Sequence, residues 1–174
     1  MVAVGRLHPQ KGYDVLLDAV GRWAGRDAPP LVAIAGDGPL HDELAARIAA
    51  ERLPVVLLGR RDDVADLLGA ADVCVLPSRW EGSPFTAQEA LRAGTPLVST
   101  RAGGIPEIVQ PGSNGELVTP GDAPALAAAL IQLLGDAPLR ERYGQAARQW
   151  VLDGFSTRSM VEGNLAVYRE VLAR

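Results

Sequence analysis

The sequence predicts a doubly wound α/β domain with a mostly parallel, six-stranded sheet and helices on both of its faces. Short apolar runs alternate with segments whose apolar residues recur at three- and four-residue steps, as strands and helices do in that fold. The runs are continuously apolar, which is typical of parallel strands that are buried on both faces. A chain of 174 residues, with 48% hydrophobic and 22% charged residues, suits one globular domain with a sizeable core.

Six short apolar runs are the expected strands, and turn residues or polar loops separate them. Cys74 lies in the fourth run, where we expect a small buried core residue. Because it is the only cysteine, no intrachain disulfide can form, which favours a reducing, cytoplasmic compartment. The expected strands are Val2–Val4, Leu31–Ala35, Val55–Leu58, Val73–Leu76, Pro96–Ser99 and Glu116–Val118.

Helical spacing of apolar residues predicts the segments between and after these strands, and the last third of the chain is helical throughout. Pro39 suits the first position of the second helix, Asp62 or Asp63 can cap the third, and Ser83 can cap the fourth. The expected helices are Tyr13–Trp23, Leu40–Glu51, one that carries Val64, Leu67 and Leu68, Pro84–Arg92, Ala123–Leu134, Pro138–Val151 and Ser159–Leu172.

Ligands of open parallel sheets bind at the carboxyl ends of the strands, so the loops after the first four strands are the candidate site. The first of these loops contains Arg6 and Lys11, two cations suited to phosphate oxygens, after Gly5, which lets backbone approach a ligand closely. The loop fits neither a Walker phosphate loop nor a dinucleotide glycine fingerprint. Taken alone, the two cations could equally be solvated loop residues.

The loop after the fourth strand carries two acidic residues around a predicted helix start. Glu81 precedes the helix, and Glu89 lies roughly 7.5 Å along its axis. Amides of residues 82–86 would form an anion site there, facing Arg6 and Lys11. Since carboxylates do not bind phosphate, we expect the two glutamates to accept hydrogen bonds from sugar and ribose hydroxyls. In isolation each has a simpler interpretation, a capping acid for Glu81 and a solvated helix residue for Glu89.

Together these motifs resemble the C-terminal domain of retaining GT-B glycosyltransferases of family GT4, the glycosyl transferases group 1. The likeness covers nearly the whole chain, and the combination is specific although each piece is weak. The matching pieces are Gly5-Arg6-Leu7 with Lys11-Gly12, Gly36-Asp37-Gly38-Pro39, Gly59 with Asp63-Val64, Ala71-Asp72-Val73, Pro77-Ser78, Glu81 and Glu89-Ala90 separated by seven residues, Gly94-Thr95-Pro96, and Gly103-Gly104-Ile105-Pro106-Glu107-Ile108.

The resemblance implies retaining transfer of a sugar from a nucleotide diphosphate donor, with no cofactor and no bound metal. UDP-sugar is the first expectation and GDP-sugar the second. Arg6 and Lys11 would contact the diphosphate, Glu81 would lie near the donor sugar, and Glu89 would hold the ribose. The family often has an aromatic residue at the position of Ser83. The further donor-binding positions that the resemblance implies are Gly5, Gly59, Arg60, Arg61, Gly82, Ser83, Pro84, Phe85 and Thr86.

The resemblance also implies a separate N-terminal domain that supplies the acceptor site and leaves room for a peripheral membrane contact. Residues 1–174 contain nothing that corresponds to it, and the abrupt start at Met1–Val4 favours an excised domain. We expect the final helix to pack toward the missing domain, and the chain alone to bind donor but transfer little. A net charge of -4 argues against a nucleic-acid surface, and no apolar stretch approaches the roughly 20 residues of a membrane span.

Three alternatives share part of this pattern. A GT-B-like sugar-nucleotide epimerase would need acid/base carboxylates and histidines at the sugar, whereas His8 and His41 are isolated. A non-catalytic nucleotide-binding module would be favoured by loss of the basic or the acidic pair, and both pairs are present. A dehydrogenase would need the glycine fingerprint, which is absent. The sequence has no Asp-x-Asp cluster that would indicate a metal site.

Overall fold

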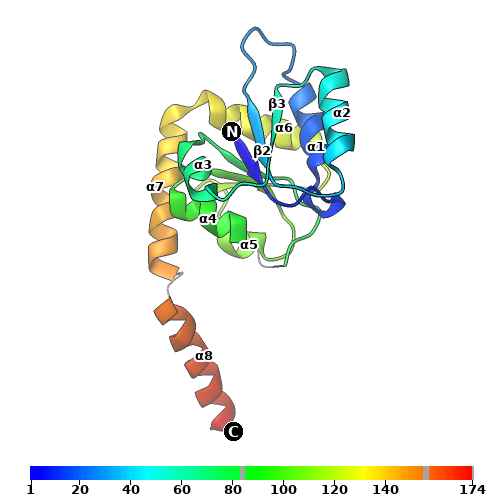
Figure 1. The fold of residues 1–174 in the computed structure, drawn as a ribbon. Helices are drawn as coiled ribbons and strands as arrows, with labels where there is room; N and C mark the ends of the chain where they lie inside the picture. The colour runs from blue at the N-terminus through cyan, green and yellow to red at the C-terminus, as the bar shows by residue number, and fades with distance from the viewer. Residues whose placement is uncertain (83–84, 155–156, 174) are drawn as a thin grey trace.

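The computed structural model describes residues 1–82, 85–154 and 157–173, and it confirms the predicted doubly wound fold. Within these residues six strands form one sheet in the order β3-β2-β1-β4-β5-β6, and every neighbouring pair is parallel (Figure 1). All six expected strands are present, with ends that shift by a residue or two. They are β1 Val2–Val4, β2 Val32–Ala35, β3 Val55–Gly59, β4 Cys74–Leu76, β5 Leu97–Thr100 and β6 Gly115–Val118.

All seven expected helices are present, and a four-residue helix that the sequence did not predict joins them. The helices are α1 Tyr13–Gly21, α2 His41–Glu51, α3 Val64–Ala70, α4 Phe85–Ala93, α5 Ile105–Ile108, α6 Ala123–Gly135, α7 Ala137–Gly154 and α8 Thr157–Leu172. A short 3-10 turn, η1, spans Pro9–Lys11 in the first loop.

One of the three expected helix-start signals is wrong, and a second is correct in position only. Pro39 does not occupy the first position of α2, because the helix begins at His41 after the cap residue Leu40. Asp63 is the cap residue of α3, but its carboxylate makes no capping hydrogen bond. Arg61 holds that carboxylate instead, with hydrogen bonds of 2.8 and 2.6 Å. The proposed cap at Ser83 lies outside the described residues.

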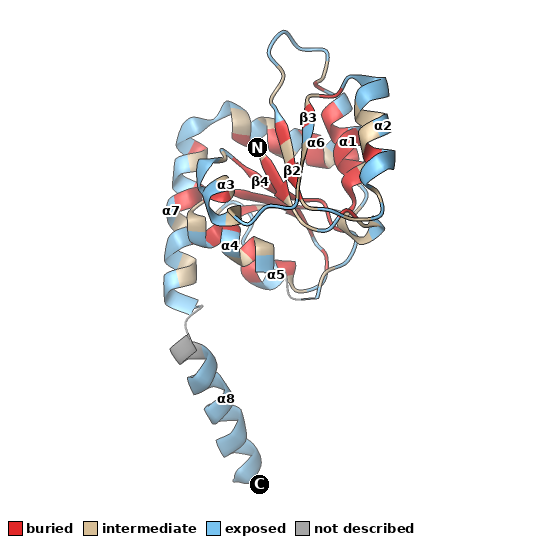
Figure 2. Ribbon diagram, viewed as in Figure 1, coloured by how far each residue is buried: buried red, intermediate tan, exposed pale blue. Residues whose placement is uncertain are grey.

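Two buried clusters, one on each face of the sheet, form the core. Val75 and Val98 belong to the cluster that α1, α2 and α6 cover, whereas Cys74, Leu76 and Leu97 belong to the cluster under α3, α4 and α5. Neighbouring residues of one strand therefore pack on opposite faces, which explains the continuous apolar runs. Figure 2 shows the central strand β4 as buried. Burial raises the pKa of the Cys74 thiol to about 12, so it stays protonated in the core as predicted.

The strand order places the carboxyl ends of β1 and β4 side by side. From β1 the chain builds outward through β2 to β3, and then crosses back so that β4 pairs with the other edge of β1. Open sheets bind ligands in the crevice at such a reversal of strand order. The loops that follow β1 and β4 are therefore the walls of the candidate site.

The last helix, α8, projects away from the body of the domain (Figure 1). None of the helices in the described part of the chain is long and apolar enough to span a membrane. The cytoplasmic location stays a prediction.

Candidate functional site

The loops after β1 and β4 are joined directly at the reversal of strand order. The backbone N–H of Arg79 donates to the carbonyl of Gln10 at 2.8 Å, and the Gln10 amide donates to the carbonyl of Trp80 at 3.0 Å. Gly12 makes this approach possible, because its φ is 65° and a Cβ there would lie 2.2 Å from the Pro77 carbonyl oxygen. The two loops thus form one connected wall.

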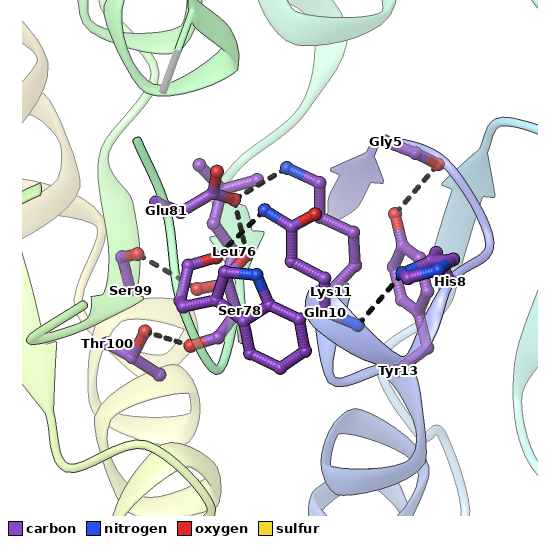
Figure 3. A network of polar contacts seen from close by, with 11 residues as sticks. Gly5, His8, Gln10, Lys11, Tyr13, Leu76, Ser78, Glu81, Ser99 and Thr100 are labelled. Carbon is purple, nitrogen blue, oxygen red and sulfur yellow. Dashed lines mark hydrogen bonds and ion pairs between the residues drawn. The ribbon is translucent and has the colours of Figure 1, made fainter. Parts of the chain in front are cut away.

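Lys11 and Glu81 meet across this wall, although the sequence analysis placed them on different parts of a ligand. The Lys11 ammonium donates to Glu81 Oε1 at 2.6 Å, and the two side chains are only 20% and 6% exposed (Figure 3). The Ser78 hydroxyl donates to the same oxygen at 2.6 Å. Burying two charges is costly, and their direct contact together with the added hydroxyl offsets that cost.

Buried hydroxyl groups lie behind the ion pair and fix the backbone that carries it. Thr100, at the end of β5, donates to the Ser78 carbonyl at 2.5 Å, and Ser99 donates to the Leu76 carbonyl at 2.9 Å (Figure 3). Ser78, Ser99 and Thr100 are almost completely buried. These hydrogen-bonding roles of the three hydroxyl groups were not predicted from the sequence. The signal was present, because polar residues at the carboxyl end of otherwise apolar strands face the ligand edge of a parallel sheet.

The loop after β5 supports Glu81 from below. Gly103 has a φ of 51°, and a Cβ at that position would lie 1.6 Å from the Glu81 carbonyl oxygen. Only glycine allows the two backbones to come this close. The glycine that the family resemblance singled out thus fixes the main chain of a candidate catalytic residue.

Arg6 differs from Lys11 although both come from the same loop. Its side chain is exposed, and it has no ion-pair partner among the described residues. The adjacent Leu7 is fully buried and anchors the loop. Gly5 is also engaged, because its carbonyl accepts a hydrogen bond of 3.1 Å from the buried Tyr13 hydroxyl. Arg6 is therefore an exposed cation in the same loop as Lys11, with no ion-pair partner among the described residues.

Gly59, Arg60 and Arg61, which the resemblance gives as donor-binding positions, lie at the carboxyl end of β3. A cavity of about 130 Å³ brings Gly5 together with Arg60 and Arg61, and Gly36 also lines it. The Gly59 carbonyl accepts the N–H of Gly36 at 2.8 Å, which holds the start of this loop against β2. The loop after β3 thus lies next to the loop after β1.

Glu89 lies apart from the Lys11–Glu81 pair, on the exposed surface of α4. It lines a cavity of about 530 Å³ between α3 and α4, and a smaller one of about 170 Å³ that Phe85 also lines. Arg92, which the sequence analysis did not select, lines both cavities. Phe85 and Thr86 form the start of α4 as described and Gly82 is exposed in the loop before it, whereas Ser83 and Pro84 lie outside the described residues.

The two histidines, His8 and His41, do not lie in a cluster of metal-ligating side chains among the described residues. His8 is the cap residue of η1, where its Nδ1 accepts the N–H of Gln10 at 3.3 Å. His41 is exposed at the start of α2 and lies beside Asp42, as expected for a solvated first-turn residue. In the described ranges no three His, Cys, Asp or Glu side chains form a group that could hold a metal ion. Metal independence stays a prediction.

A doubly wound parallel sheet with charged residues in the loops at its strand reversal is an arrangement that nucleotide-binding α/β domains use. Comparison with known families makes the assignment specific, because the model of the family described as "Glycosyl transferases group 1" matches residues 1–150. The chain belongs to this family.

Individual relatives agree with the assignment. The chain is 36% identical over 171 residues to an MMP alpha-(1->4)-mannosyltransferase of Mycolicibacterium hassiacum, covering 95% of the chain and 41% of that protein. The HepE protein of Anabaena, solved in complex with UDP, superposes with a TM-score of 0.84 at 28% identity over 99% of the chain and 48% of that structure. The C-terminal domain of a group 1 glycosyltransferase from Francisella tularensis shares the fold, with a TM-score of 0.81 at 22% identity over 90% of the chain and 86% of that domain.

The chain spans less than half the length of the curated relatives it matches, between 37% and 48% of them. Their names describe transferases and synthases, which gives the epimerase alternative no support. Membership of this family also excludes the dehydrogenase alternative.

Proposed function

We propose that this chain is the donor-binding half of a retaining glycosyltransferase and binds a nucleoside diphosphate sugar, with a UDP-sugar as the first candidate. The observation that carries the proposal is the buried Lys11–Glu81 pair at the strand reversal. Arg6, exposed in the same loop as Lys11, has no ion-pair partner in the part of the chain that the structure describes. The Anabaena relative was solved with UDP and also with UDP-glucose, which supports this choice of donor.

The chemistry follows from the charges. Cleavage of the bond between sugar and phosphate leaves negative charge on the departing diphosphate. Arg6, Lys11 and the amides at the start of α4 stabilise that charge more strongly in the transition state than in the ground state. In the structure, Lys11 is paired with Glu81. An incoming phosphate draws the ammonium toward itself, and the released carboxylate oxygen, still held by Ser78, accepts a hydroxyl of the donor sugar.

The nucleoside occupies the remaining predicted positions in this proposal. Its base lies against the backbone of residues 59–61, next to the cavity that Gly5 shares with Arg60 and Arg61. Its ribose hydroxyls bind Glu89 on the exposed surface of α4. The two cations and the helix start supply the charge stabilisation for which other transferases use a divalent ion, so the site works without a metal.

A second half completes the enzyme and supplies the acceptor. The length of the relatives supports this part of the proposal. So does α8, whose apolar side chains lie exposed on a helix that projects from the domain. We propose that α8 packs against the N-terminal half. The exposed apolar residues of α8 are Met160, Val161, Leu165, Val167, Tyr168, Val171 and Leu172.

Calorimetry with UDP, GDP and ADP tests the donor site directly. We expect the chain to bind at least one of these nucleotides, equally well with and without a chelator. Lys11→Ala should weaken binding by about 1–3 kcal/mol, since it removes one charged hydrogen-bond partner of the phosphate. Arg140→Ala is the control, because Arg140 pairs with Asp72, which precedes β4 and so lies at the opposite end of that strand from Glu81. Equal affinity of wild type and Lys11→Ala would reject the site assignment.

A further inference from the structure

A second ion pair, between Arg79 and Asp14, joins the same two loops as Lys11 and Glu81. The Arg79 guanidinium donates to both carboxylate oxygens of Asp14, at 2.7 and 2.6 Å. It also donates to the carbonyl of Pro9 at 3.1 Å, at the start of the turn that ends at Lys11. The Arg79 side chain thus binds both the loop after β1 and the first turn of α1.

General stability does not explain this arrangement. The side chains of Arg79 and Asp14 are 37% and 46% exposed, and an ion pair of that exposure contributes only about 0–1 kcal/mol to folding. The fork geometry is nevertheless complete, because two parallel hydrogen bonds fix both the distance and the orientation of the partners. The same hydrogen bonds hold the pKa of Asp14 below its usual range and raise the pKa of Arg79.

The position of the pair in the sequence indicates what it fixes. Arg79 lies two residues before Glu81, and Asp14 lies three residues after Lys11. Any shift between the two loops therefore changes the distance between the Lys11 ammonium and the Glu81 carboxylate.

We propose that Asp14 and Arg79 are positioning residues, a clamp that sets the placement of Lys11 against Glu81 and thereby the affinity for the donor diphosphate. The clamp does not touch the ligand. It acts through Lys11, and it rests on the proposed donor-binding function.

The test measures UDP affinity and melting temperature separately for Arg79→Gln, Asp14→Asn and the double variant. Each single variant should weaken UDP binding about 3- to 30-fold, the range for residues coupled through a shared network, with little change in melting temperature. The double variant should recover part of the affinity, because the Asn and Gln amides can hydrogen-bond to each other and leave no unpaired charge. Arg140→Gln, which removes an ion pair with Asp72 before the amino end of β4, should leave UDP affinity unchanged.

A double-mutant cycle with Lys11→Ala decides whether the clamp acts through Lys11. In the Lys11→Ala background, Arg79→Gln and Asp14→Asn should have little further effect on UDP binding. An equal loss in both backgrounds would mean that Arg79 contacts the ligand itself, which overturns a positioning role. Unchanged affinity in Arg79→Gln and Asp14→Asn, with Lys11→Ala still weakened, would reject the clamp and leave the proposed function standing. Unchanged affinity in all three variants would instead reject the proposed function.

Discussion

At the scale of single residues, the site is organised around one carboxylate oxygen. Oε1 of Glu81 accepts hydrogen bonds from the Lys11 ammonium and from the Ser78 hydroxyl, both at 2.6 Å. Ser78 is held in turn through its own carbonyl, to which Thr100 donates. Glu81 is thus oriented before any ligand arrives, and a donor would have to exchange only its bond to Lys11. Such preorganisation reduces the ordering that binding requires.

Ser78→Ala should destabilise the chain by about 1.5–3 kcal/mol, because it removes a hydrogen bond to a buried charged group. Ser99→Ala is the matched control: its hydroxyl is equally buried but donates to the neutral carbonyl of Leu76. That variant should lose only about 0.5–1.5 kcal/mol. Urea unfolding of both variants measures the difference. Equal losses would show that the hydroxyl of Ser78 gains nothing from the charge on Glu81.

At the scale of elements, the sequence predicts what depends on local pattern. The strands were found because burial on both faces makes most of their positions apolar, as the packing of Cys74 and Val75 on opposite faces shows. The helix α5 was missed because four residues are too few for a helical period to be visible. Asp62 or Asp63 was expected to cap α3, and Asp63 is the cap residue. Nothing in the local pattern indicated that Arg61 would hold the Asp63 carboxylate.

The pairing of Lys11 with Glu81 lies beyond local pattern. Both residues were selected from the sequence, Lys11 as a phosphate ligand and Glu81 as a hydroxyl acceptor. Their contact depends on β4 pairing with β1, across 70 residues of chain. Strand order is a property of the whole sheet, so the sequence pattern could identify these residues but could not predict that they neutralise each other.

Gly12→Ala tests how closely the two loops must approach. The substitution places a methyl group 2.2 Å from the Pro77 carbonyl oxygen and adds the strain of an alanine at a φ of 65°. Gly121→Ala supplies the control, since Gly121 has a φ of 83° with no atom within 4 Å of the added Cβ. We expect Gly121→Ala to cost about 1–2 kcal/mol from backbone strain alone, and Gly12→Ala to cost clearly more. Similar melting temperatures for the two variants would contradict the close packing of the loops.

At the scale of the whole molecule, the core residues and the candidate site residues lie on different parts of the sheet. The two core clusters fill the faces of the sheet, and the carboxyl edge is left to Lys11, Glu81, Arg6 and the cavity near Arg60. Although the net charge of the chain is -4, the cations Arg6 and Lys11 lie in a loop at this edge. Most of the large apolar side chains that are exposed among the described residues lie on α8. Figure 2 shows the described part of this helix as exposed and projecting from the domain. We therefore expect donor binding and contact with the proposed second half to use different surfaces.

This separation predicts that α8 can be altered without affecting the donor site. The test protein is a chimera in which this chain replaces the matching part of the Mycolicibacterium mannosyltransferase. Leu165→Glu should lower sugar transfer by the chimera about 10- to 100-fold, as expected when a charge enters an apolar interface. UDP binding by the isolated chain should not change. Leu31→Glu is the control, because Leu31 is also an exposed apolar residue, 58% against 42% for Leu165, but precedes β2 instead of lying on α8. Equal transfer by the two variants would reject α8 as the contact surface, whereas loss of UDP binding in Leu165→Glu would show that the two surfaces are coupled.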